Sequence, residues 1–204
     1  NSLAIIDNQD LEHDLFTLSR CLLFKKYLSQ SNVIYELGCG SCQNLLMLSE
    51  IFPSKQLYGL DWSKISIEIA DILRTRCNKK VNGILFDMIN PPPDMVIERS
   101  SAIITIHALE QLGFQYERLL SFIMAAKPAI VLHYEPILEF YDQDNLLDYL
   151  AYMYSRKRNY LSGFWPALCK LRDKNEIEII MARRPFLGGV VHETSVIIWK
   201  PLNK

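Results

Sequence analysis

The sequence lacks an excess of charge of either sign, and it lacks long apolar runs. Its 204 residues carry 22 lysines and arginines against 23 aspartates and glutamates, so the formal net charge is −1. Without a basic excess, a nucleic acid is not expected as a partner. No apolar run approaches the roughly 20 residues that cross a bilayer, and no signal-peptide pattern opens the chain. We therefore expect no membrane partner.

Internal repeats and low-complexity segments are also missing. Half of the residues are hydrophobic and 22% are charged, which is ordinary for a globular protein with a real core. The length favours a single domain over residues 1–204. Apolar residues recur at helical spacing between residues 10 and 28, so we expect residues 1–30 to form an N-terminal helical cap.

The five cysteines do not form a recognisable disulfide or metal pattern. Their odd number and scattered positions indicate reduced thiols, so we expect a cytoplasmic location. Cys39 and Cys42 are spaced as in redox motifs and as half of a zinc site. The tryptophan and cis-proline surroundings of a redox fold are not evident, and Cys77 and Cys169 do not supply a second zinc pair. We expect no metal.

Strand-like and helix-like segments alternate along most of the chain. The pattern predicts strands at 33–37, 56–60, 81–86, 102–106 and 129–133, with helices at 41–51, 63–76 and 115–126 between them. Such alternation is typical of a parallel α/β sheet with right-handed crossovers. After a further helix at 142–158, two strands at 176–181 and 192–199 follow without a helix between them. They predict an antiparallel hairpin at the end of the sheet.

The ends of the first two predicted strands carry the most informative residues. The apolar stretch Val33–Leu37 runs into Gly38-Cys39-Gly40, and the second strand ends on Asp61. Two glycines at such a turn let a ligand approach the backbone closely. A carboxylate at the tip of the second strand can accept hydrogen bonds from both hydroxyls of a ribose. The pair predicts a cofactor that contains adenosine.

The residues around the glycines indicate which cofactor it is. A dinucleotide fingerprint needs a third glycine, and Gln43 stands in its place. Glu36 precedes the first glycine by two residues, where a negative charge is unfavourable for a pyrophosphate. An acid there suits a cofactor with a cationic end, such as the ammonium group of S-adenosylmethionine (SAM).

The segment Glu36-Leu37-Gly38-Cys39-Gly40 resembles the first motif of the class I SAM-dependent methyltransferases. Ile84–Met88 is similar to the third-strand segment of that family, and 101–112 is similar to its fourth strand and following turn. Cys42 replaces a small residue that is often glycine, and a thiol is small enough to fit. The resemblance covers about residues 20–135. It implies a Rossmann-like, seven-stranded, mostly parallel sheet with helices on both faces and an antiparallel last strand.

The resemblance also implies roles for individual residues. SAM would be the cofactor and S-adenosylhomocysteine the product. Glu36 would orient the SAM amino group, Asp61 would bind the ribose, and Asp87 would accept from the adenine amino group. Further contacts are implied for the methionine part, the adenine and the sulfonium, at Gly38, Cys39, Gly40, Trp62, Met88 and His107. Structural alternatives stay open, because Asp61 could cap a helix and Asp87 could be a turn residue.

Residues after the fourth and fifth strands are the candidates for the acceptor side. His107 is a candidate general base, since its unperturbed pKa lies near neutrality, and Glu135 is a second candidate. The proposed substrate residues are Glu110, Tyr134, Glu135, Arg158, Asn159 and Tyr160. Capping and core packing explain these residues about as well. The implied reaction moves a methyl group to an oxygen or nitrogen of a small molecule, such as a sugar or a secondary metabolite.

Other functions on the same pattern remain open. One is a non-catalytic SAM-binding or scaffold protein, and another is an aminopropyltransferase-like enzyme, for which Glu110 alone is thin support. A nicotinamide-dependent oxidoreductase is disfavoured by Gln43. Nucleic-acid methylation is disfavoured because the Asn90-Pro91-Pro92-Pro93 element comes one strand too early.

Overall fold

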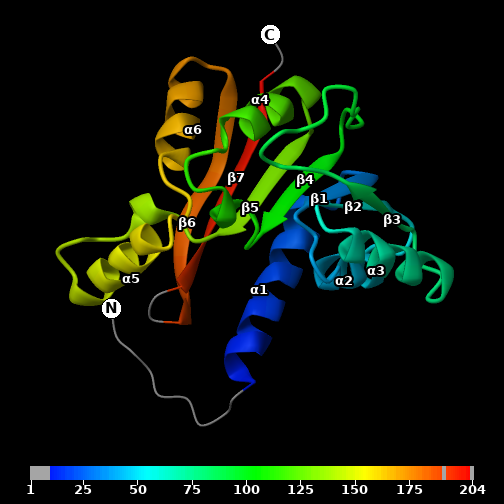
Figure 1. The fold of residues 1–204 in the computed structure, drawn as a ribbon, viewed down its shortest axis with the longest axis horizontal. Coiled ribbons are helices and arrows are strands. Elements are labelled where there is room, and N and C mark those ends of the chain that lie inside the picture. Colours follow the sequence, from blue (N-terminus) through cyan, green and yellow to red (C-terminus); the bar gives the residue numbers. More distant parts are fainter. Residues whose placement is uncertain (1–9, 190–191, 203–204) are drawn as a thin grey trace.

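The structure is a computed structural model that describes residues 10–189 and 192–202. Seven strands form one sheet in the order β3-β2-β1-β4-β5-β7-β6. Strand β7 pairs antiparallel with β5 and β6, whereas β1 to β5 pair in parallel. The predicted sheet is thereby confirmed (Figure 1). The strands are β1 (Val33–Leu37), β2 (Gln56–Asp61), β3 (Val81–Leu85), β4 (Ala102–Ile106), β5 (Ile130–Glu135), β6 (Ile177–Gly189) and β7 (His192–Pro201).

Helices cover both faces of this sheet. They are α1 (Leu11–Tyr27), α2 (Gln43–Ile51), α3 (Lys64–Thr75), α4 (Glu117–Ala126), α5 (Leu146–Lys157) and α6 (Phe164–Asp173), with short 3-10 turns η1 (Leu109–Leu112) and η2 (Leu138–Phe140). Two buried clusters follow from the alternation of side chains along the strands. One joins α1, α2 and α3 to Ile34 of β1, and the other joins α4 and α6 to Tyr35. All five side chains of β1 are buried, as expected for a strand that is covered on both faces.

The boundaries of the elements depart from the predicted ones at a few places. Helix α2 begins at Gln43 rather than 41, because Cys42 adopts a left-handed conformation with φ 59°. Helix α5 begins at Leu146, where the Asn145 side chain accepts hydrogen bonds from two backbone N–H groups of the first turn. Helix α6 was not predicted. Of the predicted N-terminal cap, residues 1–9 lie outside the described residues, and α1 forms the rest.

The final hairpin is longer than the sequence pattern predicts. Strand β6 continues to Gly189, with register shifts between residues 179 and 181 and between 183 and 187. Because β7 runs antiparallel to β5, β7 begins near the carboxyl end of β5. The extra length of the hairpin therefore lies at the end of the sheet where the parallel strands end (Figure 1). Arg184 of β6 is paired there with Asp148 of α5 and Glu193 of β7. These largely buried ion pairs attach α5 to the hairpin.

A close contact between α3 and β3 gives a stability prediction. A methyl group at Gly83 would lie 2.8 Å from Cγ2 and 3.0 Å from Cα of Ile67, so the helix backbone would have to shift. We expect Gly83→Ala to lower the free energy of unfolding by about 1–3 kcal/mol. Gly189→Ala is the matched control, with an expected change below about 0.5 kcal/mol, because no described atom lies within 4 Å of the added methyl. Urea unfolding of both variants measures the difference, and equal losses would contradict this packing.

Candidate functional site

The turn after β1 brings the backbone close to its neighbours. Gly38 and Gly40 have φ values of 74° and 49°, a region that glycine occupies without steric cost. The N–H of Gly38 donates to the Leu60 carbonyl of β2 at 2.7 Å. A methyl group at Gly38 would lie 2.4 Å from Ala108 Cβ and 3.3 Å from Met88 Cε. The loops after β1, β3 and β4 therefore meet at Gly38.

Asp61 fixes this turn from the end of β2. Its Oδ2 accepts a hydrogen bond from the Gly40 N–H at 2.8 Å, and its Oδ1 accepts one from the Ser63 N–H at 2.9 Å. The side chain is 6% exposed. A carboxylate oxygen can accept more than one hydrogen bond, so both oxygens keep acceptor capacity after these contacts. Asp61 therefore binds the backbone at the start of α3, as in the alternative capping role, and still offers acceptor oxygens at the carboxyl end of β2.

Glu36 is a fully buried acid at the same edge. Its Oε1 accepts a hydrogen bond from Asn44 Nδ2 of α2 at 2.7 Å, and Asn44 Oδ1 accepts from the Arg20 guanidinium of α1 at 2.7 Å. Glu36 Oε2 has no hydrogen-bond partner among the residues that the structure describes. Burial raises the pKa of Glu36 to about 8, although the hydrogen bond from Asn44 opposes the shift.

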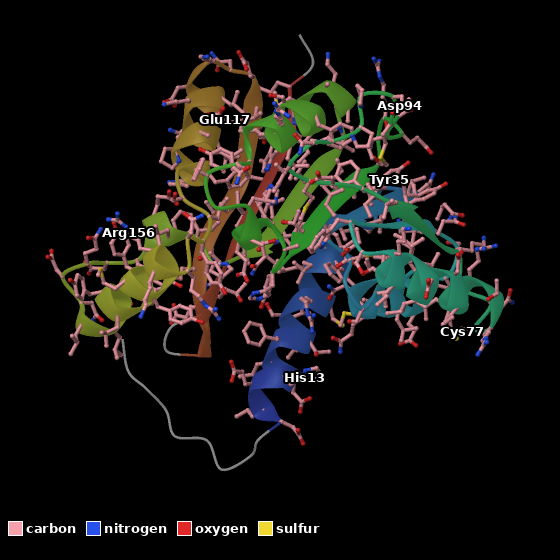
Figure 2. The ribbon with its side chains drawn as sticks, in the orientation of Figure 1. His13, Tyr35, Cys77, Asp94, Glu117 and Arg156 are labelled. Carbon is pink, nitrogen blue, oxygen red and sulfur yellow. The ribbon has the colours of Figure 1, made fainter. Side chains whose placement is uncertain are left out.

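Asn44 and Arg20 belong to the site but were not predicted from the sequence. Both are about nine-tenths buried, on helices that pack against the face of β1 that carries Glu36. The opposite face of that strand carries Tyr35 (Figure 2). Its ring stacks on that of Tyr58, with the ring centroids 4.8 Å apart. A charged residue on the core-facing side of the predicted first helix was the available signal for Arg20, since a buried cation needs a partner.

The predicted adenine contacts lie at the edge of the site. Asp87 is exposed and accepts hydrogen bonds from the Ile89 N–H at 2.8 Å and from Asn90 Nδ2 at 3.2 Å. Partial burial opposes the shift, but these hydrogen bonds hold the pKa of Asp87 below its usual value. The contacts are those of a turn, and they leave the adenine role of Asp87 a prediction. Trp62 is 81% exposed, so its ring has no packed core position.

The loop after β4 is organised by Glu135. This buried carboxylate accepts hydrogen bonds from the backbone N–H groups of Ala108, Leu109 and Glu110 at 3.1 to 3.3 Å. Burial raises the pKa of Glu135 to about 7, and the electrostatic interaction with the nearby His107 opposes that shift. A carboxylate with three backbone donors is held in a structural position. The geometry therefore gives Glu135 the role of fixing the loop, and its predicted role as a base gains no support.

His107 lies in a polar cluster with a backbone φ of 50°. Its Nε2 is 2.9 Å from the Thr194 hydroxyl of β7, and its Nδ1 is 3.7 Å from Glu110 Oε2. The ring meets Phe16 of α1 and Tyr134 edge-on at about 6 Å. His107 and Glu110 are thus brought together at the carboxyl ends of β4 and β5, as predicted for residues on the acceptor side. Thr194 joins them from the hairpin and was not predicted.

The remaining predicted acceptor residues fall into two groups. Tyr134 is fully buried, so the prediction that it contacts an acceptor requires a movement of its neighbours. Its neighbour His133 is also buried, between Thr105 and Trp199, and burial lowers the pKa of His133 to about 3. The second group, Arg158 to Tyr160, follows α5, and Asn159 abuts Gly113 beyond the β4 loop. Arg158 is exposed and lies over the rings of Tyr154 and Tyr160.

The geometry of Cys39 and Cys42 does not favour a redox function. Their sulfurs are 3.8 Å apart, both residues are buried, and both cysteines are free. The contact with Cys42 and burial raise the pKa of the Cys39 thiol, which makes it a poor nucleophile. Within residues 10–189 and 192–202, no group of three or more metal-ligating side chains is found.

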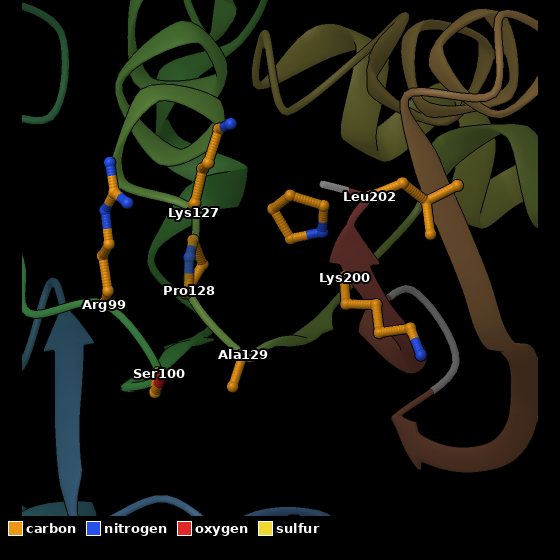
Figure 3. A pocket seen from close by; sticks show the side chains of 8 residues that line it. Arg99, Ser100, Lys127, Pro128, Ala129, Lys200 and Leu202 are labelled. Atoms are coloured by element: carbon orange, nitrogen blue, oxygen red, sulfur yellow. The ribbon is translucent and has the colours of Figure 1, made fainter. Parts of the chain in front are cut away.

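A cavity of about 470 Å³ lies where β4 and β5 begin, at the end of the sheet opposite to the candidate site (Figure 3). It is lined by loops that precede β4 and β5 and by the end of β7, with Arg99, Lys127 and Lys200 among its residues. Lys200 is paired with Glu178 at 2.9 Å. None of the predicted site residues lines this cavity.

Among the described helices, none is long and apolar enough to cross a membrane.

Comparisons with known proteins show the fold. No protein-family model and no curated protein sequence matches the chain. Among solved structures, N-methyltransferase NodS from Bradyrhizobium japonicum WM9, in complex with S-adenosylhomocysteine, has a TM-score of 0.66 at 13% identity, covering 97% of this chain and 90% of that one. A geranyl diphosphate methyltransferase in complex with SAM has a TM-score of 0.66 at 10% identity, covering 98% and 93%. The plantazolicin methyltransferase BpumL in complex with S-adenosylhomocysteine has a TM-score of 0.63 at 16% identity, covering 97% and 87%. The predicted class I methyltransferase fold is confirmed.

The buried acid gives a prediction about stability and pH. Its pKa of about 8 in the folded chain exceeds the ordinary value of 4.5, so the folded state holds the Glu36 proton more tightly. The stability that this proton contributes is full below pH 4.5 and is lost as the pH rises through about 8. Glu36→Gln keeps an acceptor for Asn44. We expect its free energy of unfolding to match that of the parent protein at about pH 5 and to exceed it by about 1 kcal/mol or more at about pH 8.5. Urea unfolding across this range measures it, and a difference that does not change with pH would contradict the assignment.

Proposed function

We propose that this chain, which has the fold of the class I SAM-dependent methyltransferases, binds SAM and moves its methyl group to a small-molecule acceptor. The observation that carries the proposal is the buried carboxylate oxygen of Glu36, which has no partner among the described residues beside the glycine turn and Asp61. A buried acceptor without a donor is costly. The ammonium group of SAM is a donor of matching charge.

Asp61 is suited to hold the ribose. Its position is fixed by two backbone N–H groups, so little entropy is lost when a ligand hydroxyl binds. The carboxylate lies at the end of β2, beside the turn where a dinucleotide or nucleoside approaches an α/β sheet. The positive φ values of Gly38 and Gly40 bend the backbone into that turn. These residues support a nucleoside site, with Met88 and Asp87 as the proposed adenine contacts.

When bound, SAM supplies an activated methyl group on a sulfonium that is already a good leaving group. The chain must then position the acceptor in line with the methyl carbon, and positioning alone can supply much of the acceleration. A base is needed only where the acceptor loses its proton early. His107 is the proposed base or wall residue, because Thr194 and Glu110 orient its ring and its side chain is 29% exposed.

The acceptor is proposed to be a small molecule that is methylated on oxygen or nitrogen, such as a sugar or a secondary metabolite. Two parts of the structure flank the carboxyl ends of the parallel strands, where an acceptor would bind. Helix α5 and the β6–β7 hairpin, which Arg184 joins, lie on one side, and α1 lies on the other (Figure 2, near Arg156 and His13). The structurally similar proteins include the geranyl diphosphate C-methyltransferase from Streptomyces coelicolor A3(2), so this fold also supports methylation of carbon. A SAM-binding scaffold and an aminopropyltransferase-like enzyme are the alternatives. We also propose that the protein has no nucleic-acid partner, on the basis of its net charge of −1, and that it is cytoplasmic, on the basis of its five scattered cysteines.

The ribose contact gives the first test. We expect Asp61→Ala to weaken SAM binding by about 1–3 kcal/mol, because the ribose hydroxyls and two backbone N–H groups lose their acceptor. Asp71→Ala is the matched control, since Asp71 is an exposed acid of α3 that pairs with Arg74. Isothermal titration calorimetry with SAM compares the dissociation constants. An unchanged value for Asp61→Ala would remove this residue from the site.

The ammonium contact gives a second test. With a pKa of about 8, Glu36 is mostly protonated at neutral pH. An ammonium group beside it would lower that pKa, so SAM binding should release a proton to the buffer. Calorimetry in two buffers with different ionisation enthalpies measures the proton, and Glu36→Gln should release measurably less. Identical proton release by the parent protein and Glu36→Gln would place the ammonium group away from Glu36.

A further inference from the structure

Helix α1 has an apolar face that nothing in the proposed cofactor site uses. Four leucines are exposed on it to between 37% and 60% of their surface: Leu11, Leu15, Leu18 and Leu22. The core-facing side of the same helix is a different one, which buries Arg20 and Phe24. At 100° per residue, the leucines centre on the side opposite to these two residues. The helix is therefore apolar on two faces, of which only one is covered by the described chain.

The leucines have the spacing of a helix-pairing seam. They follow one another at intervals of four, three and four residues, which is the alternation of the a and d positions in a heptad. A 17-residue helix spans about 25 Å, so the seam runs along most of its length. Contiguous exposed apolar surface of this kind marks an interaction site more often than scattered single residues do.

The charges beside the seam indicate what covers it. Glu12 and Asp14 lie in the first turns of α1, and Lys25 and Lys26 lie in the last turn. All four are exposed. At 100° per residue, Asp14 and Lys25 flank one side of the leucine seam, whereas Glu12 and Lys26 flank the other.

An antiparallel second copy of α1 pairs Leu15, Leu18 and Leu22 of the seam, leaves Leu11 beyond the paired leucines, and also pairs both flanks. Leu15 would lie opposite Leu22 of the other copy, and the two Leu18 residues would lie opposite each other. In the same register, acids at the start of one helix meet lysines at the end of the other, on both flanks. All of these pairings are symmetric about the turn that contains Leu18. A parallel pair would instead place like charges opposite each other, which is unfavourable.

We propose that this chain forms a two-fold symmetric dimer through antiparallel pairing of the leucine faces of α1. The inference is independent of the proposed methyl transfer, because the leucine face points away from Glu36, Asn44 and Asp61. One helix pair buries less than the roughly 1,600 Å² of a standard stable interface. We therefore expect a weak dimer, with a dissociation constant of about 1 μM or above.

Sedimentation velocity of the full chain over concentrations up to about 1 mM tests the dimer. Leu18→Glu/Leu22→Glu should raise the dissociation constant of the dimer by about tenfold or more, because each protomer would bring two charges into an apolar interface. The matched control is Leu146→Glu/Leu150→Glu on α5, where the leucines are 71% and 45% exposed, and it should dimerise like the parent protein. Circular dichroism verifies that both variants keep their helices. A chain that stays monomeric throughout, or a dimer that the α1 variant weakens no more than the α5 variant does, would overturn the proposal.

Charge reversal tests the antiparallel orientation. Glu12→Lys/Asp14→Lys should weaken the dimer, and so should Lys25→Glu/Lys26→Glu, because each change leaves like charges facing at both ends. The variant that combines all four substitutions restores opposite charges and should recover the parent dissociation constant. In a parallel dimer neither pair of substitutions would weaken association, since like charges already face each other there. That result would overturn the proposed pairing.

Discussion

The arrangement of the candidate site depends on one carboxylate, that of Asp61. Parallel pairing of β1 and β2 brings the ends of these strands together, and Asp61 then accepts hydrogen bonds from Gly40 on one side and Ser63 on the other. This side chain therefore fixes the glycine turn and the start of α3 at once. Without it, three loops would still converge at Gly38 and the Gly38 N–H would still bond to Leu60 of β2, but the N–H groups of Gly40 and Ser63 would lose their shared acceptor. The same residue is available to a ribose, so local structure and the proposed ligand contact share one group.

Several buried ionisable groups lie near the carboxyl ends of the parallel strands, and each has a different set of partners. Glu135 is satisfied by three backbone N–H groups, and Arg184 by two carboxylates. Glu36 has Asn44 on one oxygen only. Because unsatisfied buried acceptors cost free energy, this contrast distinguishes a candidate ligand site from structural networks. Glu135 thus organises the β4 loop, whereas Glu36 is the group that a cationic ligand would complete.

The sequence was sufficient for the sheet, because periodicity and glycine placement are local signals. Val33–Leu37, the two glycines and Asp61 lie where the pattern predicted. Side-chain partners were not predictable in the same way. Asn44 and Thr194 reach the site through α2 packing and a strand register that no local pattern specifies. The extent of β6 was missed because its continuation depends on pairing with β7, and the burial of Tyr134 depends on α1 lying across its ring.

The central claim is that a nucleoside with a cationic end, rather than a dinucleotide, completes the edge formed by Glu36, Gly38 and Asp61. The most direct test is calorimetric titration of the unmodified protein with SAM, S-adenosylhomocysteine and NAD⁺ under the same conditions. The account predicts saturable binding of SAM and S-adenosylhomocysteine at about micromolar dissociation constants, with no binding of NAD⁺. Binding of NAD⁺ alone, or of none of the three, would contradict it.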